Sequence, residues 1–316
     1  MTSVAVSGVS DSGSATLELR QFAVRLSGAP WSAPLSVRSD ARRVGLVGDW
    51  EPLFQLLSGR TEATSGSASV LGCELEAATS RGILGFAACD VSLPGSFTVT
   101  EYLRHAARLS HGSSSRALLD AQRALDRYGL AELAQRKLAE LALYQQRALG
   151  IALSTLTAPA VVCLEAPLRQ LDARSADYIA RLCGEAASHS RVLLSAPVPG
   201  SPSPERSLLG ACDELLVQKQ GTLIAQGTPS EVFAPGTRYA LSVKGAKIAE
   251  FSQALRAAGL RLDARAEPGS FSVELPAAGG ASTDLLLDTA LDHGLIVLEL
   301  EPIFVQSAVG SGLAAV

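Results

Sequence analysis

The chain has 316 residues, of which 47% are hydrophobic and 18% are charged, and its formal net charge at pH 7 is −4. This composition is typical of a soluble globular protein of about two domains. It argues against a nucleic-acid partner, because no strongly basic surface is expected. Only four of the 27 basic residues are lysines: Lys137, Lys219, Lys244 and Lys247. The first 136 residues therefore exclude any chemistry that needs a lysine ammonium.

The cysteines and histidines are dispersed along the chain, without a CxxC, HExxH or HxH pattern. Disulfide frameworks and zinc sites need paired or clustered spacing, so we expect reduced thiols and no metal site. The apolar runs are shorter than the roughly 18 residues that span a bilayer. Residues 1–15 lack the basic start and apolar core of a signal peptide, and are predicted to form a disordered arm.

Strands and helices alternate through most of the first 235 residues. Apolar runs and alternating patterns predict strands at 17–26, 33–38, 43–48, 67–71, 81–87, 160–164 and 191–195, with 64–66 as a turn. Helical periodicity is found at 53–57, 98–110, 115–128, 145–156 and 175–189. Thr98 and Glu101 are predicted to form a capping box at the second of these helices. The alternation indicates a mainly parallel α/β core.

The composition changes near Pro235-Gly236, and a second pattern follows. It predicts a strand at 238–243, a helix at 247–258, strands at 260–266 and 270–275, a helix at 283–293 and a strand at 295–302. This βαββαβ order is that of a ferredoxin-like unit. We therefore predict a small α+β domain at 237–303, followed by a flexible tail at 304–316.

A series of short motifs runs in order along residues 17–302. Val44-Gly-Leu-Val-Gly48 and Leu56-Leu-Ser-Gly59 flank one turn, and the stretches 141–172 and 212–231 follow. Together they resemble the ATPase of an ABC transporter, of the exporter type that carries a C-terminal accessory domain. The resemblance implies an ABC ATPase-like domain at 16–235, with a mixed-sheet core and a helical subdomain at about 90–145.

The phosphate-binding loop is the first motif that departs from this family. Such a loop needs glycines whose amides cradle phosphates, a lysine and a Ser/Thr on Mg²⁺. Gly45 and Gly48 persist, but Asp49-Trp-Glu-Pro52 follows directly, and four residues of the family spacing are missing, the lysine included. Asp49 and the glutamate would repel a phosphate, and Trp50 stands where bare amides belong. We predict an ordinary strand-to-helix turn.

The magnesium ligand and the catalytic base are expected after the strand at 160–164. Glu165 keeps a carboxylate at the magnesium position, whereas Ala166 stands at the position of the base. The loss of a general base typically lowers a rate about 10²–10⁴-fold. Without the lysine, Glu165 is expected to be a structural carboxylate that caps or pairs.

Most of the remaining motif positions also depart from the family pattern. The signature segment is Leu141-Ala-Leu-Tyr-Gln145, in which Gln145 persists while Leu143 and Tyr144 place side chains where the partner's phosphate would approach. Three further positions are occupied by Cys89 (Q-loop), Pro197 (switch histidine) and Asp172 (dimer-facing loop). Asp172 matches the family, although an ordinary helix-entry carboxylate fits equally well.

These substitutions favour a pseudo-ATPase that uses no cofactor. The resemblance implies a non-catalytic subunit of an ABC exporter-type complex at the cytoplasmic face of the membrane. Its partners would be a permease, a catalytic ATPase paralogue, or a second subunit in a homo- or heterodimer. Two alternatives stay open: a weak nucleotide-binding or residual ATPase subunit, and a stand-alone interaction protein of a membrane-associated assembly, such as a motility system.

Overall fold

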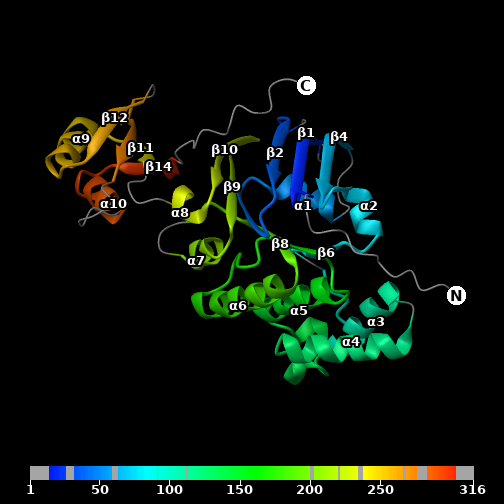
Figure 1. Ribbon diagram of the computed structural model, residues 1–316. Coiled ribbons are helices and arrows are strands. Elements are labelled where there is room, and N and C mark those ends of the chain that lie inside the picture. The colour runs from blue at the N-terminus through cyan, green and yellow to red at the C-terminus, as the bar shows by residue number, and fades with distance from the viewer. Residues whose placement is uncertain are drawn as a thin grey trace. The chain divides into compact units, whose positions relative to one another are not determined.

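The computed structural model (Figure 1) divides into two compact units, Met1–Leu223 and Ile224–Val316. It describes residues 14–25, 32–58, 63–90, 92–111, 113–199, 203–219, 221–233, 238–265, 268–275 and 283–303. The predicted tail, the composition change at 235–236 and most of the predicted arm lie outside these ranges. The described part of the chain begins within that arm: Ala15 is buried, and its carbonyl accepts a hydrogen bond from the Leu71 amide (2.8 Å).

A six-stranded sheet forms the centre of the first unit, in the order β10-β9-β3-β8-β7-β6. Its strands are β3 (Arg43–Gly48), β6 (Leu84–Ala87), β7 (Val161–Leu164), β8 (Arg191–Ala196), β9 (Glu214–Lys219) and β10 (Thr222–Gly227). The five strands from β9 to β6 pair in parallel. Such strands are apolar along their whole length when both faces of the sheet are covered. The prediction of a mainly parallel core is confirmed.

An antiparallel sheet in the order β2-β1-β4-β5 lies beside it. Its strands are β1 (Leu17–Arg25), β2 (Leu35–Ser39), β4 (Ala63–Val70) and β5 (Cys73–Glu74). The turn predicted at 64–66 is wrong, because these residues lie inside β4. Gly66 has a φ of +72°, and the register with β1 shifts opposite it, between Arg20 and Ala23. Gly66 therefore lies in a strand opposite a bulge of β1, and not in a turn.

One hydrophobic core fills the space between the two sheets. It joins apolar residues of β1 and β2 to residues of β3, β7, β8 and β9, and helix α1 (Glu51–Leu57) lies within it. Leu53, Phe54 and Leu57 are the buried face of α1. The short helix α2 (Leu75–Ser80) leads from β5 to β6. The turn after β3 is thus held from both sides by packed sheets.

The other face of the parallel sheet is covered by helices. They are α5 (Leu143–Thr155), α6 (Ala173–His189) and α7 (Pro204–Gly210). Helices α3 (Val99–His111) and α4 (Ser114–Arg127) pack against each other. In the sequence they lie between β6 and α5, within the range of the predicted helical subdomain. The capping box of α3 is confirmed, because Thr98 N donates to Glu101 Oε2 (2.8 Å) and Glu101 N donates to Thr98 Oγ1 (3.2 Å).

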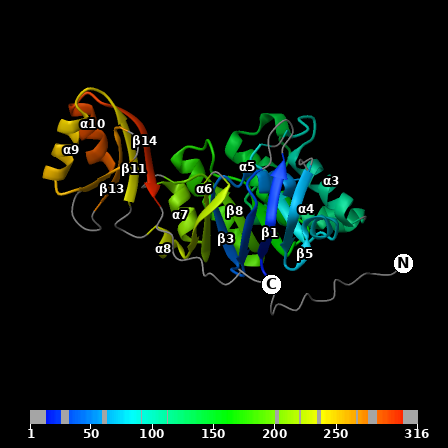
Figure 2. The same ribbon diagram turned by 90° about the horizontal axis from the view of Figure 1, so that it is seen from above.

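The second unit contains the short helix α8 (Pro229–Val232) and then the elements β11, α9, β12, β13, α10 and β14. The bounds are Arg238–Lys244, Ile248–Ala257, Arg261–Ala264, Ser270–Glu274, Thr283–Asp292 and Ile296–Ile303. The strands form an antiparallel sheet in the order β12-β13-β11-β14. Figure 2 shows α9 and α10 on one face of this sheet. The predicted succession of strands and helices is confirmed.

No helix within the described ranges is both long enough and apolar enough to cross a membrane.

Candidate functional site

The positions that correspond to a nucleotide site lie at one edge of the parallel sheet. Strands β3, β6, β7 and β8 run in the same direction, and their register places Val47 opposite Ala196 and Leu164 opposite both Ala87 and Leu194. Gly48, Cys89, Glu165 and Pro197 therefore stand at or just beyond the carboxyl ends of neighbouring strands. Ligands of open α/β sheets bind at this edge.

Trp50 fills the space beneath the shortened loop. Its side chain is only 2% exposed and belongs to the core between the sheets. The indole Nε1 donates to the carbonyl oxygens of Val47 (3.2 Å) and Leu216 (3.1 Å), so the buried polar atom is satisfied. The sequence predicts Trp50 at the place of open loop amides. In the structure, the Trp50 side chain is part of the hydrophobic core.

Two glycines are packed tightly in this turn. A Cβ on Gly45 would meet the side chains of Leu215 and Leu209, and one on Gly48 would collide with the carbonyl oxygen of Gln218. Gly48 also has a φ of +94°, a region that favours glycine. The hollow whose lining includes Asp49, Trp50 and Gln218 has a volume of about 30 Å³, small beside the roughly 300 Å³ or more of small-molecule sites. Close packing, against side chains at Gly45 and against backbone at Gly48, thus explains both glycines without a phosphate.

Glu165 turns away from the shortened loop and toward the end of β6. Its Oε2 accepts a hydrogen bond from the backbone amide of Cys89 (3.1 Å), and its own amide donates to the Ala87 carbonyl (2.9 Å). The next residue, Ala166, has a φ of +38°, and its amide donates to Ser195 Oγ (3.0 Å). Glu165 therefore joins the end of β7 to the end of β6 by hydrogen bonds. This agrees with the expectation that Glu165 is a structural carboxylate.

Arg147 is a site residue that the motif analysis missed. It lies in α5, is 7% exposed, and its Nη2 donates to Cys89 Sγ (3.1 Å). The Nε atom has no hydrogen-bond partner among the described residues, although it is shielded from solvent. Burial raises the pKa of the Cys89 thiol, and the Arg147 charge opposes that shift. The sequence did offer a signal for this residue. Arg147 stands two positions after Gln145, among the apolar residues of a buried helix.

The signature positions form the start of α5, away from Trp50. Leu143 and Tyr144 are 37% and 36% exposed. The Tyr144 ring packs edge-on against Tyr178 of α6, with centroids 6.0 Å apart, and Arg181 lies over the Tyr178 ring. Gln145 Oε1 accepts from the Ala142 amide (2.9 Å) and Gln145 Nε2 donates to the Tyr144 hydroxyl (3.3 Å). The retained glutamine thus satisfies an amide at the start of its own helix.

Asp172 and Pro197 have simple structural environments. Asp172 caps α6, because its carboxylate accepts from the Ser175 amide (3.0 Å) and from the Ser175 hydroxyl (2.8 Å). These hydrogen bonds lower the pKa of the Asp172 carboxyl. Pro197 follows β8 and is exposed. Within the described ranges, no three His, Cys, Asp or Glu side chains lie together as a metal ion would need.

The cap at Asp172 predicts a pH dependence of stability. A carboxyl whose pKa is lowered on folding contributes stability above its unfolded pKa of about 3.9, and loses it as the pH falls through the folded pKa. We expect Asp172→Asn, which keeps an acceptor but no charge, to be less stable than the wild type at pH 7. The difference should shrink as the pH falls below about 4. Urea denaturation at pH 3 and pH 7 measures it, and a difference independent of pH would contradict the charge-assisted cap.

Comparison with known proteins gives this geometry a context. No protein-family model matches the chain. LivG of Salmonella typhimurium, a high-affinity branched-chain amino acid transport ATP-binding protein, is 31% identical over 120 residues, which cover 38% of this chain and 46% of LivG. YxlF of Bacillus subtilis, an uncharacterized ABC transporter ATP-binding protein, is 25% identical over 179 residues, covering 57% of this chain and 58% of YxlF.

Two further proteins are similar. The ATP-binding cassette sub-family G member 5 of Rattus norvegicus is 27% identical over 190 residues, which cover 57% of this chain and 28% of the rat protein. The matched part spans less than two thirds of each of these three relatives. The structure of CbiO1 from Clostridium perfringens, part of the ABC transporter complex CbiONQ, superposes with a TM-score of 0.57 at 18% identity, covering 78% of this chain and 98% of CbiO1.

The sequence relatives are ATP-binding proteins by name, and three of these four proteins are described as parts of ABC or amino acid transport systems. The likeness to CbiO1 establishes the mixed α/β fold of an ABC ATPase domain. It agrees with the resemblance that the ordered motifs predict. The sequence relatives share only part of their length with this chain, so its type of subunit and the role of the site are argued below as a proposal.

Proposed function

We propose that the chain is a non-catalytic, ATPase-like subunit of an ABC exporter-type membrane complex, in which it scaffolds or regulates its partners. The observation that carries this proposal is the buried Trp50. Its indole lies in the core and bonds to two strand carbonyls where an ATPase would hold its phosphate loop. The turn after β3 is anchored by this buried side chain, and we propose that its amides are therefore not available to a phosphate.

The chemistry at the neighbouring strand ends supports the same proposal. Glu165 is engaged with the Cys89 amide, and Ala166 has a methyl group where a general base would act. Pro197 has neither a proton donor nor an acceptor in its side chain. The sequence has no residue at the position of the family's lysine, because the loop segment that would carry the lysine is absent after Gly48. Hydrolysis therefore lacks its phosphate clamp and its base.

The start of α5 supports a contact different from a shared nucleotide. In a head-to-tail pair of ATPases, the signature amides of one subunit face the nucleotide of the other. Here Leu143 and Tyr144 cover that position, and the Tyr144 ring is held by Tyr178. Exposed tyrosine beside arginine is common in protein interfaces. The proposal therefore gives this surface a role in protein contact.

The relatives suggest the kind of partner. LivG and YxlF are transport ATP-binding proteins, and CbiO1 is part of a transporter complex. We accordingly propose a permease, a catalytic paralogue or both as partners, and a position at the cytoplasmic membrane surface reached through them. The second unit, with its βαββαβ order, would be a ferredoxin-like accessory domain that mediates homo- or heterodimer contacts.

The decisive test is a calorimetric titration of the full chain with Mg-ATP, beside a catalytically active ABC ATP-binding subunit under the same conditions. We expect no saturable heat with this chain and a normal isotherm with the active subunit. Micromolar binding would instead support a nucleotide-binding subunit and overturn the proposal.

Affinity purification from membranes of the native organism tests the partner half of the proposal. Recovery of a multispanning permease or an ATPase paralogue supports it. Recovery of only non-transport proteins would favour the stand-alone interaction protein. A Leu143→Ala/Tyr144→Ala double variant should reduce recovery if the start of α5 contributes to the contact, and Leu109→Ala on α3, an exposed leucine, is the matched control.

A further inference from the structure

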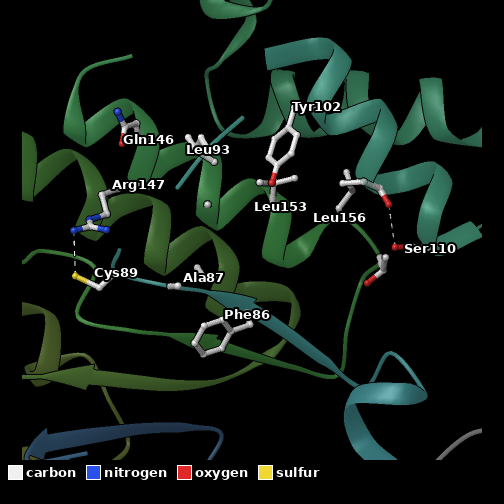
Figure 3. Close-up of a pocket in the computed structure, with 14 residues that line it drawn as sticks. Phe86, Ala87, Cys89, Leu93, Tyr102, Ser110, Gln146, Arg147, Leu153 and Leu156 are labelled. Atoms are coloured by element: carbon white, nitrogen blue, oxygen red, sulfur yellow. Dashed lines mark hydrogen bonds between the residues drawn. The ribbon is translucent and has the colours of Figure 1, made fainter. Parts of the chain in front are cut away.

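A cavity of about 320 Å³ lies between the end of β6 and helices α3 and α5 (Figure 3). Its volume is within the range of small-molecule sites, which are mainly apolar with a few polar groups. It is about ten times larger than the hollow beside Trp50. Because all of its lining comes from the first unit, the cavity is formed by a single packed body.

Aromatic and leucine side chains line the middle of the cavity, and Gln146 and Thr157 add polar groups to its lining. Phe86 of β6 forms its floor in the view of Figure 3, Tyr102 of α3 points into it from above, and Leu93, Leu153 and Leu156 complete the wall. Phe86 is itself supported by Phe54 of α1, with ring centroids 6.0 Å apart. The Ser110 hydroxyl, at the end of the cavity remote from Arg147, is already bonded to the Ala106 carbonyl (3.1 Å).

Arg147 and Cys89 form the other end of the cavity (Figure 3). The Arg147 guanidinium is buried, yet its Nε–H has no acceptor among the described residues. The nearby Asp90 carboxylate, 3.8 Å from Nη2, has a side chain that is 76% exposed, so it offsets little of the charge. Glu165 is occupied by the Cys89 amide. A buried donor without a partner costs free energy, so it indicates a missing acceptor.

We propose that this cavity binds a small carboxylate with an apolar body. Its carboxylate accepts hydrogen bonds from Arg147, and its apolar body lies among Phe86, Tyr102 and Leu153. Arginine is suited to this role because it stays charged and presents several donors to a carboxylate. The ligand would also contact the residue that joins α5 to the end of β6, since Arg147 bonds to Cys89 Sγ.

Calorimetry of the full chain with octanoate and with octan-1-ol tests the charge requirement. The two probes share an apolar body and differ in the carboxylate. We expect saturable octanoate binding that is at least about tenfold tighter than octan-1-ol binding, as a charged hydrogen bond would give. Absence of saturable octanoate binding, or equal affinities, would overturn the proposal.

Two variants locate the bound molecule. Ala106→Leu fills the cavity from α3 and should weaken octanoate binding by tenfold or more, whereas Ala257→Leu, an exposed residue of α9, should leave it unchanged. Arg147→Gln should remove the preference for octanoate over octan-1-ol. If that variant does not fold, Ala106→Leu decides alone. Undiminished octanoate affinity in Ala106→Leu would place the molecule elsewhere and refute the site.

Discussion

Replacing Trp50 with alanine is expected to lower the free energy of unfolding by about 3–5 kcal/mol, which is typical of deleting a large buried side chain. The side chain is almost completely buried and contributes to the core between the two sheets. Its removal also leaves the Val47 and Leu216 carbonyls without the indole donor. The effect is large because this turn is packed from both sides.

Urea denaturation followed by circular dichroism measures this difference. Tyr144→Ala, at a half-exposed aromatic of the same unit, is the control and should lower stability much less. Trp50→Phe should fall between the two, since it keeps an aromatic ring but loses the N–H. A Trp50→Ala variant as stable as the wild type would mean that the turn does not depend on this side chain, and would remove the main support for the proposed function.

Replacing Gly48 with alanine is expected to lower the free energy of unfolding by about 2–4 kcal/mol, from backbone strain and steric overlap together. The φ of +94° disfavours any side chain, and the new Cβ would collide with the Gln218 carbonyl of β9. Relief would require β3 and β9 to separate at the last pair of their register, Gly48 opposite Gln218.

Gly82→Ala separates the two causes. Gly82 has a φ of +67°, but a Cβ there would meet open space, so this variant reports the backbone preference alone, about 1 kcal/mol. Thermal and urea unfolding of both variants should rank Gly48→Ala as the more damaging. Equal effects would show that the contact with Gln218 is easily relieved.

The elements with the strongest patterns were predictable from the sequence. The bounds of β3 agree with the prediction residue for residue, and α3 begins at its predicted capping box. Buried parallel strands and amphipathic helices leave direct marks in local composition. The structure of residues 64–66 was not predictable in this way, because the local sequence does not distinguish a glycine opposite a bulge of another strand from a glycine in a turn.

The candidate site was predictable as a set of altered positions but not as an arrangement. The missing lysine predicted a structural role for Glu165, and for Asp172 the sequence left a family loop position and a helix-entry carboxylate open; in the structure Glu165 accepts from the Cys89 amide and Asp172 caps α6. The place where the Trp50 side chain packs depends on β9, because its indole bonds to Leu216, 166 residues later in the chain. Arg147 escaped notice for the same reason, since its burial is decided by β6 and its neighbours.

The packing of Trp50 also has an evolutionary consequence. On the proposed function, a phosphate loop could not form here by one point mutation, because an insertion is needed and the indole is packed in the core beside the turn. Each intermediate on that route would carry a displaced tryptophan and a weakened core before it gained any affinity for phosphate. If the proposed function is correct, selection for folding opposes the recovery of a phosphate loop, and the packed core keeps descendants of this chain in the proposed non-catalytic role.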